Sequence, residues 1–413
     1  MSALSSYRRL FSLTGPTYVV IAFLARLPLA MSQMGTLLLV AGVTGSFGAG
    51  GAAAGAFAVV NAIASPIAGA LTDRIGQRPV LLVQSVVGSL ALGALVVLSA
   101  ADVPWQLLAV VSGVAGMFVP QVGTLARVRW RELAATSGKD RFRLVSAAFS
   151  YEGSADEASF VLGPAIVGTI AALLSPAGAI VLAAVMLAVF GLWFALHPSA
   201  DAVPGHRGQG PALTGRLLRP LLVGLAAGQL MVGVIFGSVQ TGTTALATEA
   251  GEPGLAGLMH GLLGIGSVVA GLSLAALPSR FRLADRLPVF AGGLALLSLP
   301  LLLVGGLGGL AVVLLVLGVV VAPYMITLFS ACERVIEPRR LGAAMMVLAA
   351  ATSLGYALGS SIAGQLADAG GYNHAYRVTI VAAFLALGLA LLLRGALHRE
   401  RRAQQAAGTL QEE

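Results

Sequence analysis

Twelve apolar stretches run through this 413-residue chain, and short polar segments separate them. They lie near residues 14–41, 47–70, 79–100, 104–126, 143–174, 177–196, 218–247, 254–278, 287–305, 308–331, 341–366 and 375–393. An α-helix of about twenty apolar residues crosses the hydrocarbon core of a bilayer. A soluble domain could not bury this much apolar surface, because 57% of the residues are hydrophobic and 10% are charged. The sequence therefore predicts an all-α membrane protein with twelve transmembrane helices.

The basic residues predict the orientation of these helices. If the N-terminus lies inside, all of the 25 basic residues except Arg26 and Arg377 fall in segments on the inner side or in the C-terminal tail. Basic residues collect on the cytoplasmic side of membrane proteins. We therefore expect a multi-pass protein of the inner (plasma) membrane with both termini in the cytoplasm. The net charge of +8 then reflects topology, and we expect no nucleic-acid partner.

The spans divide into two halves of six around a polar linker. We expect an N-terminal bundle over 1–196, a cytoplasmic linker over 197–217, a C-terminal bundle over 218–394 and a cytoplasmic tail over 395–413. Residues 116–125 in span four parallel 318–328 in span ten, and 163–168 in span five parallel 359–364 in span eleven. Repeats of this kind are typical of transporters whose substrate site lies near the middle of the membrane.

A charged turn at residues 69–79 joins spans two and three, with the sequence Gly-Ala-Leu-Thr-Asp-Arg-Ile-Gly-Gln-Arg-Pro. Gly69 allows two helices to approach closely, and Gly76 supplies the positive φ that a short reversal needs. Asp73 and Arg74 can cap a helix end and form ion pairs there.

This turn resembles the loop between helices two and three of the major facilitator superfamily, where it serves as a conformational gate. The residues that carry the resemblance are Gly69, Asp73, Arg74, Gly76 and Arg78, whereas Gln77 stands where a basic residue is usual. The resemblance extends to the twelve spans, the linker and the repeat. It implies two pseudo-symmetric six-helix bundles that work by alternating access.

Four ionisable residues lie inside predicted spans, namely Arg26 in span one and Glu152, Asp156 and Glu157 in span five. Each costs at least ~2.5–3.5 kcal/mol to insert, so each needs a reason. At 1.5 Å per residue, Arg26 lies ~18 Å deep, Glu152 ~15 Å and Asp156 ~21 Å. Glu152 and Asp156 share a helix face, whereas Glu157 points ~100° away from Asp156. Pairing of Arg26 with these acids is therefore geometrically allowed.

Two functions fit this group of charges. In the first, which we prefer, the residues form a proton-coupling relay in which one carboxyl binds and releases a proton. In the second, they form a static ion pair that holds span one against span five. Glu157 is then a structural partner or a second acid facing a water-filled cleft.

Span five also resembles drug–proton antiporters of this superfamily, which carry Gly-x-x-x-Gly-Pro-x-x-Gly-Gly there. Gly163, Pro164 and Gly168 match this pattern, while Ser159 and Val167 depart from it. Pro164 removes a helix hydrogen bond and the glycines admit close contacts, so this helix can bend. An ordinary kinked membrane helix would show the same residues.

The antiporters also carry an arginine in span four, within Arg-x-x-Gln-Gly. Here Ala109 and Ser112 precede Gly113, so that arginine is absent. We hypothesise that Arg26 supplies the missing positive charge from span one.

Spans one, four, seven and ten line the cavity in this superfamily, and the resemblance implies substrate contacts there. The candidates are Gln33, Met34, Phe118, Gln121, Gln229, Phe236, Gln240, Tyr324 and Met325. They are neutral, which favours a neutral, partly apolar substrate over a polyanion. Packing between helices is the alternative role for each.

We therefore expect a monomeric secondary transporter in the lipid bilayer that exports a small organic compound (a drug, antibiotic, sugar or metabolite) in exchange for protons. A proton symporter that imports a nutrient would use the same parts. A polytopic enzyme or sensor is a third alternative, but no catalytic cluster or large soluble domain is evident. The sequence shows no motif for a cofactor or a metal, and we expect none.

Overall fold

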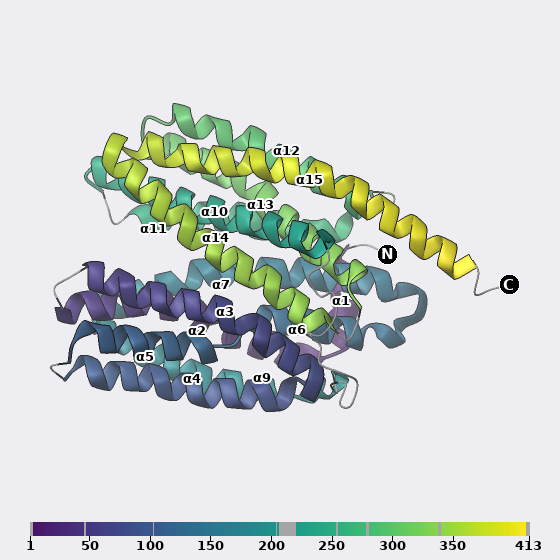
Figure 1. Cartoon of the computed structure of the whole chain (residues 1–413), viewed down its shortest axis with the longest axis horizontal. Coiled ribbons are helices and arrows are strands. Elements are labelled where there is room, and N and C mark those ends of the chain that lie inside the picture. The colour runs from purple at the N-terminus through teal and green to yellow at the C-terminus, as the bar shows by residue number, and fades with distance from the viewer. Residues whose placement is uncertain are drawn as a thin grey trace. The chain divides into compact units, whose positions relative to one another are not determined.

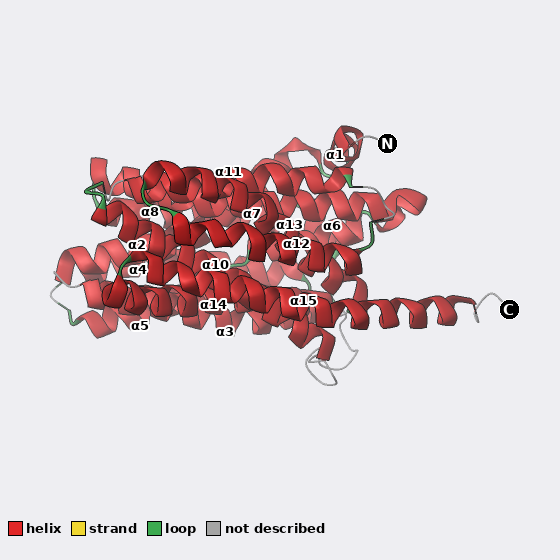
Figure 2. Ribbon diagram, turned by 90° about the horizontal axis from the view of Figure 1, so that it is seen from above, coloured by secondary structure: helices red, strands yellow, loops and turns green. Residues whose placement is uncertain are grey.

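The structure is a computed structural model, and it describes residues 3–44, 47–101, 103–203, 205, 220–252, 255–277, 281–337 and 340–409. Within these residues every regular element is helical (Figure 2). Most of the expected linker, residues 204 and 206–217, lies outside the described ranges. By its contacts the chain divides into two compact units: Met1–Thr214 with Arg339–Leu354, and Gly215–Pro338 with Gly355–Glu413.

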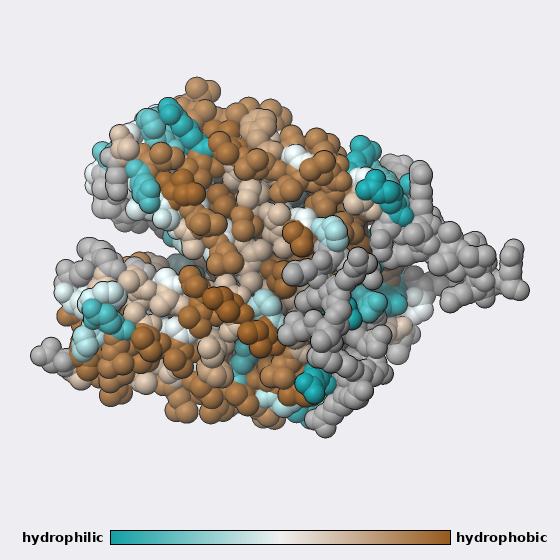
Figure 3. Space-filling view, in the orientation of Figure 1, coloured by the Kyte–Doolittle hydropathy of each residue, from teal (hydrophilic) through white to brown (hydrophobic). Residues whose placement is uncertain are grey.

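Eleven helices in the described ranges are long and apolar enough to cross a membrane. The twelfth long helix is α7 (Arg141–Leu173), which has 33 residues but carries the three acids of span five. Large apolar side chains such as Leu90, Val97 and Leu303 point outward. Figure 3 shows hydrophobic residues over the sides of the helices and hydrophilic ones gathered toward their ends. This distribution fits a surface that faces lipid, so the expected all-α membrane fold is confirmed.

The first unit begins with the short helix α1 (Ala3–Ser12), for which the sequence analysis assigned no element. The following elements are α2 (Gly15–Thr44), α3 (Phe47–Ile75), α4 (Gln77–Ser99), α5 (Trp105–Phe118), α6 (Val122–Leu133) and α7, then α8 (Pro176–Met186) and α9 (Leu192–Leu196). A turn of π-helix, Leu187–Gly191, joins α8 to α9, so these three segments form one span. The core of this unit lies between α2, α3, α4, α5, α7 and α8 (Figure 1).

Span four is broken into two helices, whereas the apolar pattern predicted one helix that ends near residue 126. Pro120 has no N–H to continue the helical ladder, so α5 ends at Phe118 and α6 begins at Val122. The second half, α6, then continues to Leu133 and carries three arginines that the sequence analysis assigned to an inner loop. Two of them, Arg127 and Arg129, are almost completely buried.

The second unit contains α10 (Pro220–Glu249), α11 (Ala256–Ser273), α12 (Leu283–Ser298), α13 (Leu307–Val335) and α15 (Tyr372–Thr409), together with the second part of α14 (Leu341–Gly370). Glycines allow close packing here, since a Cβ on Gly355 would lie 2.0 Å from the carbonyl oxygen of Leu230. The helix α15 continues through the expected tail as far as Thr409.

Candidate functional site

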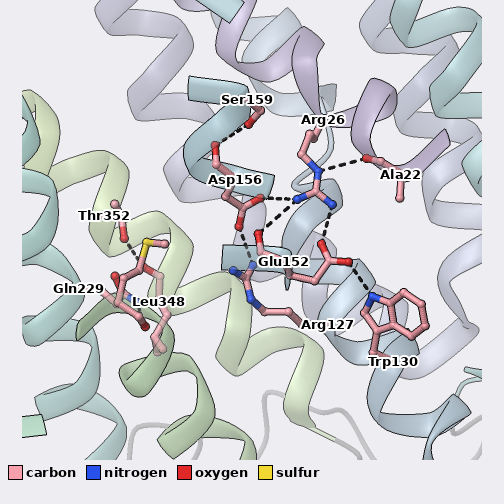
Figure 4. A network of polar contacts seen from close by, with 11 residues as sticks. Ala22, Arg26, Arg127, Trp130, Glu152, Asp156, Ser159, Gln229, Leu348 and Thr352 are labelled. Atoms are coloured by element: carbon pink, nitrogen blue, oxygen red, sulfur yellow. Dashed lines mark hydrogen bonds and ion pairs between the residues drawn. The ribbon is translucent and has the colours of Figure 1, made fainter. Parts of the chain in front are cut away.

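A buried network of charges joins α2, α6 and α7 in the first unit (Figure 4). Its centre is Arg26, whose side chain is 3% exposed. Arg26 Nη2 lies 2.5 Å from Glu152 Oε2, and Arg26 Nη1 lies 3.0 Å from Asp156 Oδ1. Its Nε donates to the carbonyl oxygen of Ala22 one turn earlier in α2. The pairing of Arg26 with both acids, which helix depth allowed, is therefore present.

Glu152 is the fully buried acid of this network. It is completely buried, and its second oxygen accepts a hydrogen bond of 2.6 Å from the indole N–H of Trp130 in α6. Trp130 is itself enclosed, with the ring of Tyr18 packed against it edge to face. Because both carboxylate oxygens have donors, Glu152 is held in one orientation.

Asp156 is the accessible acid, with a side chain that is 21% exposed. It lies between two arginines, since its second oxygen is 2.8 Å from Nη1 of Arg127 in α6. The carboxylate also rests directly on the backbone of α6, because a Cβ on Gly123 would lie 2.1 Å from Asp156 Oδ1. Asp156 thereby ties α2, α6 and α7 together.

A glycine in α7 brings these helices into register. A Cβ on Gly163 would lie 2.6 Å from the Cβ of Ala30, so α7 touches α2 one turn beyond Arg26. Pro164 follows within the same helix, which continues unbroken. A Cβ on Gly168 would instead meet nothing within 4 Å. Of the three residues that match the antiporter pattern, Gly163 is therefore the one whose small size the packing requires.

Glu157, the third acid, is also buried, with 3% of its surface exposed. It follows Asp156 directly, so its side chain leaves α7 at ~100° from that of Asp156.

Arg127 and Trp130 were not predicted as site residues from the sequence. The hypothesis that Arg26 supplies a positive charge that span four lacks is incomplete, because Arg127 of span four also contacts Asp156. A signal was available, since Arg127 and Trp130 are three apart and share a face of any helix that continues past residue 126.

The turn between α3 and α4 binds the first part of α14, which belongs to the same unit. Asp73 accepts hydrogen bonds of 3.0 and 2.9 Å from the backbone N–H groups of Gly342 and Ala343. A Cβ on Gly69 would lie 2.9 Å from the Cα of Ala343, so the close approach expected at Gly69 is observed. Asp73 thus caps the first turn of α14 rather than its own helix.

The rest of this turn is held by polar contacts. Gly76 has a φ of +88°, the conformation that the reversal was expected to need. Arg78 pairs with Asp201 at 2.9 Å, and Arg74 is exposed. Gln77, which departs from the family pattern, is buried and accepts a hydrogen bond of 2.8 Å from Nε of Arg129.

The cavity candidates of the first unit are all partly exposed, and these are Gln33, Met34, Phe118 and Gln121. Met34 packs on the apolar core, and the Gln121 amide donates to Asn61 Oδ1 at 2.8 Å.

The candidates of the second unit differ more among themselves. Gln229, Tyr324 and Met325 are buried, and the Gln229 amide donates to the carbonyl oxygen of Met325. The Tyr324 hydroxyl donates to Ala386 of α15, which favours the packing role for this residue. Phe236 and Gln240 are partly exposed, and the hydroxyl of Tyr356 donates to Gln240 Oε1.

Within the described ranges, no group of three or more His, Cys, Asp or Glu side chains could hold a metal ion.

Comparison with known proteins identifies relatives at the level of family and fold. The sequence model of the Major Facilitator Superfamily matches residues 18–351 and 282–411. No curated protein sequence matches the chain.

Several solved structures resemble this one. A bacterial homologue of the iron transporter ferroportin in an outward-facing state has a TM-score of 0.73 at 14% identity, over 92% of this chain and 98% of that one. The human organic anion transporter MFSD10 has a TM-score of 0.68 at 18% identity, over 91% and 100%. The E. coli fucose:proton symporter FucP has a TM-score of 0.65 at 16% identity, over 92% and 99%.

Proposed function

Because the chain belongs to the major facilitator superfamily, a family of transporters and not of enzymes, we propose that it is a proton-coupled antiporter. Its substrate is a small organic compound, which it exports by alternating access. The observation that carries this proposal is Asp156, an acid whose side chain is 21% exposed while two buried arginines hold it.

The charges explain how a proton changes the structure. Arg26 and Arg127 are balanced by Glu152 and Asp156, with Glu157 buried nearby. Removing one partner of a buried ion pair costs ~3–5 kcal/mol. When Asp156 binds a proton, its contact with Arg127 loses the charge attraction and α6 is held less tightly against α7. The proton therefore favours a different arrangement of these helices.

The two acids have different roles in this mechanism. We assign the exchange of protons to Asp156 because part of its side chain is exposed, whereas Glu152 is enclosed and both of its oxygens have donors. Glu152 keeps Arg26 in place throughout the cycle. We assign Glu157, which is buried, a structural role.

Antiport results if the substrate binds when Asp156 is ionised. A proton and a substrate that favour opposite arrangements reduce each other's affinity by the same factor. The polar side chains near the middle of the spans in the first unit, such as Gln33 and Gln121, suit a neutral compound. We place the turn between α3 and α4 and both termini in the cytoplasm, on the distribution of basic residues. The partial antiporter pattern in α7 favours export over import.

Transport by the purified protein in liposomes tests the proposal. A thermal-shift screen of antibiotics, sugars and metabolites first identifies a ligand. An antiporter accumulates that ligand when the lumen is more acidic than the outside, whatever the orientation of the protein. Accumulation under the opposite gradient would instead establish symport, and no response to either gradient would refute proton coupling.

Variants then test the role of Asp156. We expect Asp156→Asn to abolish gradient-driven accumulation while ligand exchange without a gradient continues. Thr169→Val in the same helix is the control, because Thr169 is exposed and bonds only to its own helix. Unchanged accumulation by Asp156→Asn would assign the network a static structural role.

A further inference from the structure

The broken span four needs a donor that the helix itself cannot supply. In a continuous helix the carbonyl oxygen of Gly116 would accept from the N–H of residue 120, but Pro120 has none. Beyond Phe118 the helix stops, so the carbonyl oxygen of Val119 also leaves the regular ladder. In the hydrocarbon core each unsatisfied carbonyl group is costly.

Asn61 of α3 supplies these missing hydrogen bonds. Its Nδ2 donates to the carbonyl oxygens of Gly116 at 2.7 Å and Val119 at 3.0 Å. Its Oδ1 accepts from the Gln121 amide at 2.8 Å. Asn61 is 3% exposed, and all of its side-chain bonds go to the break between α5 and α6. It therefore stabilises the broken form of the span specifically.

The half-helix beyond the break carries three residues of span four that contact the two acids. Gly123 seats the Asp156 carboxylate, Arg127 pairs with it, and Trp130 donates to Glu152. The spacing of four and then three residues places all of them on one face of α6. The other half, α5, packs instead against α3 through Gly113 and Gly116.

We propose that α6 is the element that responds to a proton on Asp156, pivoting at residues 119–121, with Asn61 and Gly123 as the positioning residues. This inference rests on the proposed function, because it names the moving part of that same site. The ionisable groups that face Asp156 are Arg26 from α2, Arg127 from α6, and Tyr151 and Glu152 from α7, whereas Glu157, the next residue of α7, is buried and points ~100° away. Among these ionisable groups Arg127 is the one on the pivoting half-helix, so its contact with Asp156 is the ion pair that opens.

Distances between spin labels measure this motion without any substrate. Cys332 is the only cysteine, so Cys332→Ala gives a background for labels at chosen pairs of positions. The test pair is Ile67→Cys on α3 with Glu132→Cys near the end of α6. The control pair is Ile67→Cys with Val185→Cys on α8, and both of these residues face outward. Labelled protein in lipid nanodiscs is titrated with acid.

We expect the test pair to change distance as the pH falls and to remain in the low-pH distribution in Asp156→Asn at every pH. The control pair should not change. If the distance of the test pair changed neither as the pH falls nor in Asp156→Asn, the inference would be overturned. If the test pair moves but no pH gradient drives transport, the proposed function fails and the pivot stands.

Gly123→Ala separates positioning from protonation. The added Cβ overlaps the Asp156 carboxylate, so we expect the test pair to leave its neutral-pH distance without acid. Gly93→Ala in α4 is the matched control, because nothing lies within 4 Å of its Cβ. An unchanged distance in Gly123→Ala would contradict the positioning role that we assign to the contact between Gly123 and the Asp156 carboxylate.

Substitutions of Asn61 should change the width of the distance distribution in the same measurement. Asn61→Leu removes both donors at the break, and we expect a broader distance distribution for the test pair at neutral pH. Asn61→Asp keeps the size of the side chain and, when protonated, one donor, so it should recover part of the narrow distribution at low pH. A narrow distance distribution in Asn61→Leu would show that the break in span four does not depend on the hydrogen bonds from Asn61.

Discussion

Spans four and ten share one packing contact but differ in the backbone beyond it. In the first unit a Cβ on Gly116 would lie 2.2 Å from the carbonyl oxygen of Phe57, and in the second a Cβ on Gly318 would lie 2.2 Å from that of Leu263. Gly116 thus allows span four to pack closely against α3, and Gly318 allows span ten to pack closely against α11. The repeat that the sequence suggested at these two positions therefore corresponds to equivalent close contacts.

Four residues further along, the two spans differ in one backbone donor. Pro120 has no N–H, the helix breaks, and the Asn61 amide supplies the donors. At the equivalent place Ala322 retains its N–H, which donates to Ser267 Oγ at 3.1 Å, and α13 continues through Pro323. A shift of the proline by one residue thus accompanies the change from a continuous helix to two half-helices.

The chemistry of the two units differs in the same way. The half-helix α6 meets charged partners in α7, whereas the buried contacts of the second unit include neutral ones, such as the 2.7 Å hydrogen bond between the Ser238 and Thr379 hydroxyls. On the function that we propose, we expect the proton to bind in the first unit and not in the second. Three predictions compare the two units, and a fourth concerns the pH response of the first unit.

The largest effect should come from removing the central charge. Arg26→Met leaves two acids without their shared partner, and we expect a loss of ~3–5 kcal/mol in stability. Gln229→Leu, which removes a neutral buried hydrogen bond in the second unit, should cost about 1 kcal/mol. Unfolding can be followed by a thiol-reactive dye, because Cys332 is the only cysteine and is completely buried. Equal losses would remove the contrast between the units.

The next effect concerns the two side chains that hydrogen-bond to the backbones of spans four and ten, namely Asn61 and Ser267. Asn61→Leu leaves two carbonyl groups without a donor, at ~1–3 kcal/mol for each buried group. Ser267→Ala in α11 removes the side-chain acceptor of the Ala322 N–H in the continuous helix α13, and it should cost roughly 0.5–1.5 kcal/mol. The same dye assay compares the two melting temperatures. If Ser267→Ala proved the more damaging change, the break in span four would not depend on Asn61.

The two close contacts should respond alike. Gly116→Ala and Gly318→Ala each force a Cβ against a carbonyl oxygen, and overpacking of this kind costs ~1–3 kcal/mol. Gly93→Ala, which meets open space, serves as the reference. A clear difference between the two variants in the dye assay would show that the packing is not equivalent after all.

The smallest effect concerns pH at the end of α9. Burial and the neighbouring Arg129 hold the pKa of His197 below its ordinary value of 6.5. The unfolded chain then binds more protons, so this residue's contribution to stability is present above pH 6.5 and declines as the pH falls below it. His197 packs on Tyr18 and is partly exposed, so the change should be slight. Melting temperatures of His197→Gln should lack this acid-side decline; an unchanged decline would assign it to other groups.

Several features of the site could be predicted from residue spacing. The depths of Arg26, Glu152 and Asp156 depend only on where a span begins, and the structure pairs them. The positive φ of Gly76 follows from the short reversal in the same way. Arg127 escaped prediction because an arginine just past an apolar stretch is typical of an inner loop, and its burial depends on how far α6 continues.

The order of apolar and charged residues alone determined that this chain crosses a membrane many times and predicted that a few charges lie within its spans. That outcome follows from the cost of exposing apolar surface to water and from the rise per residue of a helix. Only the tertiary structure decided that Asp156 lies between two arginines, that Trp130 reaches Glu152 and that Asn61 supports the break at Pro120. These contacts join residues distant in sequence, and close packing at Gly123 and Gly163 sets which helix faces meet.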